Sequence, residues 1–201
     1  IELEKLYPGA IALFFQGAGG NQIAYPRKTD ESARQYGRTL AAAVERVISE
    51  NMTELSANLT SSYSEVGLEL YKSDPNTEDF SNIVRDGSDK NQADSSSKIY
   101  PYPVQVWTIG EQPLITLGGE PIVEYALELK QIFGQQAFVF GYCNDVMAYM
   151  STPLVLDEGG YEGASSPVKG MKWGVNTEAL IIQEILRLAK QSGLSMHNPA
   201  P

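Results

Sequence analysis

The chain has 201 residues, of which 42% are hydrophobic and 20% are charged, so it has the composition of one globular domain and not of a disordered chain or a coiled coil. Its net charge of −10 argues against a general nucleic-acid or anionic-membrane binder, because both tasks need a basic surface. The longest apolar runs, residues 10–15 and 137–142, are far shorter than the roughly 20 residues that cross a bilayer. We therefore expect no transmembrane segment and no nucleic-acid partner.

Two residue types that often carry chemistry are scarce. Cys143 is the only cysteine, which excludes an internal disulfide, and its apolar neighbours predict a small buried hydrophobe. His197 is the only histidine, so neither a Ser-His-Asp triad nor a site with several histidines is easily built within these residues. The chain begins at Ile1 and not at Met, which predicts an N-terminus shortened by processing or cloning. An enzyme of either kind would keep part of its machinery elsewhere.

The first part of the sequence predicts a strand, a helix and a second strand. The apolar run at 10–15 predicts a buried strand that leads into a glycine-rich turn. Asp30 is a suitable N-cap for a helix to about Ser49, whose apolar residues have the three-to-four spacing of a buried stripe. Residues 65–72 alternate apolar and polar side chains, as in a half-exposed strand.

The sequence from residue 73 to the end predicts an excursion and then alternating elements. Residues 73–98 are so polar that we interpret them as a long surface excursion and not as a domain boundary. The following sequence predicts a hairpin of strands 104–109 and 113–117, a helix that starts with Pro121 in its first turn and ends at Gly134, a buried strand at 137–142, a glycine-rich loop at 157–170 and a helix at 177–191. This order predicts an α/β fold, with a mixed β-sheet flanked by helices as a three-layer sandwich in a single domain over residues 1–201.

The first candidate site is the turn that contains Gly17, Gly19, Gly20 and Asn21. Glycines that follow a buried strand let backbone N–H groups approach a ligand closely, and such groups can line an anion or oxyanion site. The spacing matches neither of the common phosphate-binding signatures. On these residues alone, a tight turn without a ligand is the simpler interpretation.

Three other candidates also stand close to predicted strand ends or loops. Glu120 would lie where a strand ends and a helix begins, where the helix dipole favours an ionised carboxylate; it could equally be a plain helix cap. Asn144 follows a buried strand, a position typical of site residues. Tyr161 stands between glycines on an expected flexible loop, where a tyrosine is more often a hydrophobic lid residue.

Taken together, these stretches resemble the neutral/alkaline non-lysosomal ceramidase family. The matching pieces are residues 13–22 (Leu-Phe-Phe-Gln-Gly-Ala-Gly-Gly-Asn-Gln), Ile109-Gly110 with 117–121 (Leu-Gly-Gly-Glu-Pro), 141–144 (Gly-Tyr-Cys-Asn), 149–153 (Tyr-Met-Ser-Thr-Pro) and 159–163 (Gly-Gly-Tyr-Glu-Gly). They occur in the family's order with similar gaps and cover most of the chain outside 73–98. Members of the family are secreted or membrane-associated hydrolases that use one catalytic zinc to cleave the amide bond of ceramide.

The resemblance implies a zinc-dependent amide hydrolase that acts on a small-molecule or lipid amide. It implies site residues of three kinds: metal ligands Glu120 and Tyr161, catalytic-turn residues Gly19, Gly20 and Asn21, whose N–H groups would hold an oxyanion, and substrate-binding residues Gln16, Asn144 and Tyr149. The family's other ligands are histidines in an N-terminal portion. The chain is therefore expected to be the C-terminal part of a larger zinc-hydrolase catalytic domain, with that missing N-terminal part as a partner. Zn²⁺ is then expected in the full-length protein but not tightly bound to this chain alone, and the expected location is secreted or periplasmic.

Two alternatives stay open at this point. Long-form ceramidases carry Gly-Asp and a serine in the turn, whereas this chain has Gly20-Asn21 and no serine. That difference favours a non-catalytic α/β ligand-binding module that kept the fold and lost the metal chemistry. A phosphate or nucleotide binder that uses the glycines of the turn is the third interpretation, and the lack of a basic residue close behind the turn disfavours it.

Overall fold

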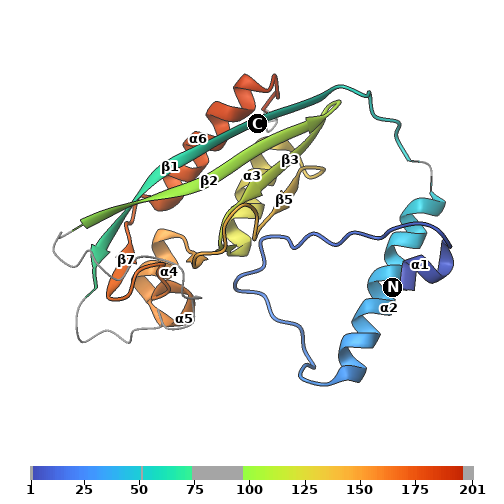
Figure 1. Ribbon diagram of the computed structural model, residues 1–201, viewed down its shortest axis with the longest axis horizontal. Coiled ribbons are helices and arrows are strands. Elements are labelled where there is room, and N and C mark those ends of the chain that lie inside the picture. The colour runs from blue at the N-terminus through green and yellow to red at the C-terminus, as the bar shows by residue number, and fades with distance from the viewer. Residues whose placement is uncertain (1, 51, 74–96, 197–201) are drawn as a thin grey trace. The chain divides into compact units, whose positions relative to one another are not determined.

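The computed structural model describes residues 2–50, 52–73 and 97–196, and it divides the chain into two compact units (Figure 1). One unit consists of residues 1–15 and 23–55, and the other of residues 16–22 and 56–201. The polar excursion predicted at 73–98 falls almost wholly outside the described residues, and so does His197.

The first unit contains two helices, α1 (Glu2–Leu6) and α2 (Asp30–Ser49). The helix predicted over these residues of α2 is confirmed, but its N-cap is Thr29 and not Asp30, because the Thr29 side chain accepts the Ser32 N–H at 3.1 Å. The expected buried stripe is wrong. Of the residues in α2 only Ala41 is buried, and the apolar side chains of the stripe are largely exposed.

The buried strand predicted at residues 10–15 is not formed. These residues have no strand assignment, and Ile11 and Phe14 are 83% and 71% exposed. A strand needs a neighbour that pairs with its backbone N–H and C=O groups, and no strand among the described residues pairs with this run. The predicted burial of this run is therefore also wrong, because an apolar run carries no information on whether a pairing strand is present.

The second unit is built on a mixed five-stranded sheet. Its described strands lie in the order β5 (Phe138–Phe140), β3 (Gln112–Leu117), β2 (Ser97–Ile109), β1 (Leu59–Lys72) and β7 (Met171–Trp173). The β3–β5 pair is parallel and the other pairs are antiparallel. The predicted hairpin is therefore confirmed as β2–β3, and the strands predicted at 65–72 and 137–142 are confirmed with different ends.

Helices α3 (Val123–Phe133) and α6 (Thr177–Gln191) share one hydrophobic core with this sheet and confirm the predicted α/β class with helices flanking a mixed sheet. In β1 the alternate residues Leu68 and Leu70 are fully buried, whereas Tyr71 is exposed. The core joins these leucines to aromatic and aliphatic side chains of β2, α3 and α6, and each fully buried Leu or Ile stabilises the fold by about 1.5–3 kcal/mol.

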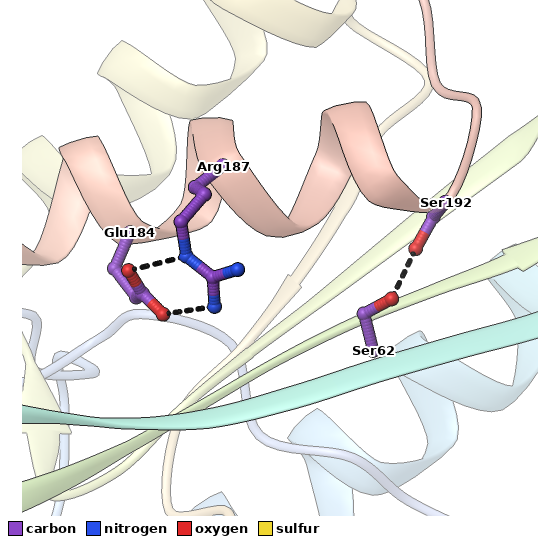
Figure 2. Close-up of polar contacts among 4 residues, drawn as sticks. All are labelled: Ser62, Glu184, Arg187 and Ser192. Carbon is purple, nitrogen blue, oxygen red and sulfur yellow. Dashed lines mark hydrogen bonds and ion pairs between the residues drawn. The ribbon is translucent and has the colours of Figure 1, made fainter.

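Helix α6 is also tied to the sheet by a polar contact. Figure 2 shows the Ser192 hydroxyl, just beyond the end of α6, at 2.9 Å from the Ser62 hydroxyl of β1. The same view shows Arg187 of α6 paired with Glu184 at 2.6 Å. This pair lies within α6 and stabilises the helix itself by only about 0.2–0.5 kcal/mol, whereas apolar burial holds α6 on the sheet.

A second, two-stranded sheet joins β4 (Glu120–Pro121) to β6 (Tyr149–Met150), and two short helices follow, α4 (Pro153–Glu158) and α5 (Gly160–Gly163). The glycine-rich loop predicted at 157–170 is thus partly helical, and Tyr161 lies in α5. A hydrogen bond of 2.9 Å from the Ser151 hydroxyl to the Glu162 carbonyl ties α5 to the segment after β6. Among the described residues, no helix is both long enough and apolar enough to span a membrane.

Candidate functional site

Glu120 and Tyr149 are held next to each other by the short parallel pair β4–β6. Their Cα atoms are direct partners in the pair, and the Glu120 N–H donates to the Ala148 carbonyl at 2.8 Å. The backbone of Tyr149 is fixed on both sides: its N–H donates to the Ser165 hydroxyl at 3.2 Å, and its carbonyl accepts the Trp173 indole N–H at 3.0 Å. The backbone positions that carry the Glu120 carboxylate and the Tyr149 phenol are therefore fixed.

Gly119 makes this close approach possible. Its φ of +65° lies in the left-handed region, and a Cβ placed on it would come within 2.5 Å of the Ala148 carbonyl oxygen. Its N–H donates to the Asp145 carbonyl at 2.8 Å, and its carbonyl accepts the Tyr142 N–H at 2.9 Å. The residue before Glu120 thus ties β4 to the segment that follows β5.

Two phenols contact the Glu120 carboxylate, and a third phenol contacts one of these two. The Tyr142 hydroxyl donates to Glu120 Oε2 at 3.1 Å, and Tyr149 also forms a side-chain hydrogen bond with Glu120. The ring of Tyr161 meets the ring of Tyr149 edge to face, with centroids 5.4 Å apart. Glu120, Tyr142 and Tyr149 are half-buried, and Tyr161 is 38% exposed.

The phenols next to Glu120 are neutral hydrogen-bond donors at physiological pH. Burial raises the pKa of Tyr142 to about 12, with the charge of Glu120 and the hydrogen bond to it as smaller causes. Burial also raises the pKa of Tyr149, followed by its hydrogen bond to Glu120 and the charge of Glu120. The cluster is thus a carboxylate that accepts hydrogen bonds from phenols held in place by β4–β6 and the segment after β5.

The glycine-rich turn closes against this cluster at Gly20. Its N–H donates to the Pro121 carbonyl at 2.9 Å, and a Cβ on Gly20 would lie 2.7 Å from the Glu120 carbonyl oxygen and 3.1 Å from Tyr149 Cδ1. Within the turn, the Gln22 N–H donates to the Gly19 carbonyl at 2.9 Å. The N–H of Gly20 already forms a hydrogen bond within the protein. Only other N–H groups of the turn could therefore bind an oxyanion.

Asn21 anchors the turn on helix α3. Its Oδ1 accepts the Val123 N–H at 2.9 Å, and its Nδ2 donates to Glu124 Oε2 at 3.0 Å. The N-cap residue of α3, Ile122, has no side chain that can accept such a bond, so Asn21 supplies the cap from 102 positions away.

Gln16 and Asn144 contact the same region of the fold but not the carboxylate cluster. The Gln16 carbonyl accepts the Gly141 N–H at 3.0 Å, and its side chain is exposed. Asn144 is exposed, and its Nδ2 lies 3.5 Å from Oε1 of Gln105 on β2. The structure thus brings Gly20, Glu120, Tyr149 and Tyr161 together, with Gly19 and Asn21 in the adjoining turn. The roles assigned to these residues stay predictions.

The oxygen donors of the cluster fit part of a catalytic zinc site. Such a site takes three protein ligands, and Glu120 with one phenol would supply two of them. A phenol that binds a metal gives up its proton, so a cation would replace the hydrogen bonds that now link phenol and carboxylate. Among the described residues, no group of three or more His, Cys, Asp or Glu side chains is placed to hold a metal.

Tyr142 is the member of the cluster that the sequence did not reveal. It closes the apolar run 137–142, where a tyrosine is indistinguishable from an aromatic residue of the core. Its positive φ of 59°, which turns the chain after β5, has no signature in its residue type. Only the pairing of residue 142 with residue 119 shows that it faces Glu120.

Comparison with known proteins gives a match among solved structures. No protein-family model and no curated protein matches the sequence. Among solved structures, the chain is similar to a ceramidase complexed with C2, with 17% sequence identity and a TM-score of 0.51. The match covers 84% of this chain and 36% of the ceramidase, so the chain spans little more than a third of that protein. At this identity the similarity concerns the fold: the chain has the α/β fold of part of a ceramidase.

Proposed function

We propose that this chain is part of a zinc-dependent amide hydrolase of the neutral ceramidase type, which cleaves N-acylsphingosine or a related N-acyl amide. The observation that carries the proposal is the half-buried Glu120 carboxylate, which contacts the phenols of Tyr142 and Tyr149, with the ring of Tyr161 against Tyr149 and the turn at Gly20 packed beside them. The fold shared with part of a ceramidase supports it.

Each residue of the cluster has a distinct role in this proposal. Glu120 is the anionic ligand, and Tyr161 is the second ligand; Tyr149, which already contacts both residues, is the phenol best placed to replace it. Zinc, when bound, supplies Lewis-acid chemistry: it lowers the pKa of water to about 7 and polarises an amide carbonyl. N–H groups of the turn other than that of Gly20 would stabilise the developing negative charge, while Asn21 keeps the turn fixed on α3.

The remaining metal ligands lie outside the described residues in this proposal. Histidines of an N-terminal part of the same protein would complete the site, and the substrate would be a lipid or a smaller amide. A secreted or periplasmic location belongs to the same proposal. This chain alone would be inactive and would hold zinc only weakly.

The test uses the protein expressed from its complete gene. Glu120→Ala should abolish zinc content and the hydrolysis of ceramide, simple N-acyl amides and N-acyl amino acids together. Glu111→Ala, which removes an exposed carboxylate of the β2–β3 hairpin, is the matched control and should keep both. Activity retained by the Glu120→Ala protein would refute the ligand assignment.

One observation favours a second candidate, a non-catalytic α/β ligand-binding module. Both polar groups of the Asn21 side chain form hydrogen bonds with α3, so this side chain has a structural role. Members of the ceramidase family carry Asp at the corresponding position. The sequence upstream of Ile1 discriminates between the two candidates. A His-x-His motif after a strand supports the enzyme, and binding of an N-acyl amide without turnover by the complete protein supports the module.

A further inference from the structure

The backbone of Tyr142 has a conformation that its residue type disfavours. Its φ of +59° lies in the left-handed region, which Gly and Asn adopt far more readily than Tyr. Two hydrogen bonds keep the segment against the strand end that leads into Glu120: the Tyr142 N–H donates to the Gly119 carbonyl at 2.9 Å, and the Cys143 N–H donates to the Leu117 carbonyl at 3.0 Å. If the turn alone mattered, a smaller residue would form it with less strain.

The contact made by the Tyr142 side chain explains why a tyrosine stands at this position. Its hydroxyl reaches across to Glu120 Oε2 at 3.1 Å, and it approaches the carboxylate from a different segment than Tyr149 does. Glu has several rotatable bonds, and a carboxylate that is already held loses less conformational entropy when it binds a ligand. In metal sites, hydrogen-bonded partners of this kind orient the ligating carboxylate.

We infer that Tyr142 is a positioning residue for Glu120: its phenol holds the carboxylate in the orientation that faces Tyr149 and so prepares it to bind a cation. The cation-binding half of this inference rests on the proposed function, whereas the positioning half stands on the contact itself. Tyr142 acts through Glu120 and needs no contact with substrate.

The first test concerns the metal-free 201-residue chain. Tyr142→Phe should increase the mobility of the Glu120 side chain, measured as a lower NMR order parameter of its methylene carbons. Tyr100→Phe is the matched control. The Tyr100 hydroxyl of β2 donates at 2.6 Å to Oδ2 of Asp145, which lies in the same segment after β5 as Tyr142, and this hydrogen bond does not involve Glu120. An unchanged order parameter for Glu120 in Tyr142→Phe would overturn the inference.

The second test is a zinc titration, by competition with a chromophoric chelator, of the protein expressed from its complete gene, in which the proposed histidines complete the site. Tyr142→Phe should weaken zinc affinity by about 10- to 100-fold, Tyr100→Phe should leave it unchanged, and Glu120→Gln should weaken it at least as much as Tyr142→Phe. Tyr142→Asn provides a second variant that suits the left-handed backbone and lacks the phenol, in case the Phe variant fails to fold.

The two tests separate this inference from the proposed function. If Glu120→Gln leaves zinc affinity unchanged, the metal assignment fails, and the order parameter alone decides whether Tyr142 positions Glu120. If Glu120→Gln weakens zinc binding and Tyr142→Phe does not, the inference is overturned while the metal assignment stands.

Discussion

Gly20 determines how closely the glycine-rich turn approaches Glu120. A methyl group at this position would meet the Glu120 carbonyl oxygen at 2.7 Å, a distance that forces backbone to move. Gly20→Ala should therefore lower the stability of the second unit by about 1–3 kcal/mol. Chemical denaturation followed by tryptophan fluorescence measures this, because Trp107 and Trp173 both belong to that unit. Gly37→Ala, where a methyl group meets nothing within 4 Å, should not lower the same transition, and an equal loss in both variants would contradict the steric argument.

Asn21 contributes to stability as the remote cap of α3. Asn21→Ala should cost about 1–2 kcal/mol and reduce the hydrogen-exchange protection of the first turn of α3, because the Val123 N–H loses its acceptor. Asn176→Ala is the control, since Asn176 stands at the N-cap of α6 without forming a side-chain capping bond. If both substitutions had the same effect on their helices, the capping role of Asn21 would be wrong.

The candidate site could be predicted in part from single residues. Glu120 stands out because two glycines and a proline flank it. The structure places Glu120 and Pro121 in the short strand β4, and α3 begins only at Val123, so the prediction that Pro121 lies in the first turn of the helix is wrong. The surroundings of the Glu120 carboxylate could not be predicted, because they depend on the pairing of residue 120 with 149 and on the left-handed turn at Tyr142. Neither feature leaves a periodic signal in the sequence.

At the scale of elements, the spacing of apolar residues predicted the helices α2, α3 and α6, whereas the strand predicted at 10–15 is not formed. The difference is physical. A helix satisfies its hydrogen bonds within one segment, so local sequence largely determines it. A strand depends on a partner that is distant in the sequence, and an apolar run cannot tell whether that partner is present.

Carboxylates on α6 should give the second unit a measurable pH dependence. Burial, and then the charges of Glu128 and Glu124, raise the pKa of Glu178 above its ordinary value of 4.5. The folded state thus holds this proton more tightly than the unfolded state, so stability falls as pH rises through the unfolded value and then through the raised folded value. Glu178→Gln should be more stable than the native chain at pH 7, with a difference that disappears near pH 3 in thermal melts.

Glu184 on the same helix provides a control of opposite sign. Its hydrogen bond to Arg187 is the largest cause that lowers its pKa below 4.5, so its contribution is present above the unfolded value and is lost as pH falls through the folded value. Glu184→Gln should therefore be less stable than the native chain at pH 7 and equal to it at low pH. A stabilising effect of Glu184→Gln at pH 7, or a destabilising effect of Glu178→Gln, would contradict these assignments.

At the scale of the whole molecule, apolar surface is the feature with the clearest consequence. Leu13 and Phe14 are 77% and 71% exposed within a run of apolar residues, and contiguous exposed apolar patches favour association. The 201-residue chain should therefore self-associate as its concentration rises in analytical ultracentrifugation, and a Leu13→Ser, Phe14→Ser double variant should do so less. Equal association of both proteins would show that this run is not responsible.

The central claim is that Glu120 and a phenol of its cluster share a cation. Anomalous diffraction at the zinc edge, from crystals of this chain soaked in zinc, tests it directly. The account predicts a zinc peak at about 2.0–2.2 Å from a Glu120 carboxylate oxygen, with the hydroxyl oxygen of Tyr161 or Tyr149 in the same coordination shell. Zinc bound only at other positions, with Glu120 still hydrogen-bonded to Tyr142 and Tyr149, would contradict it.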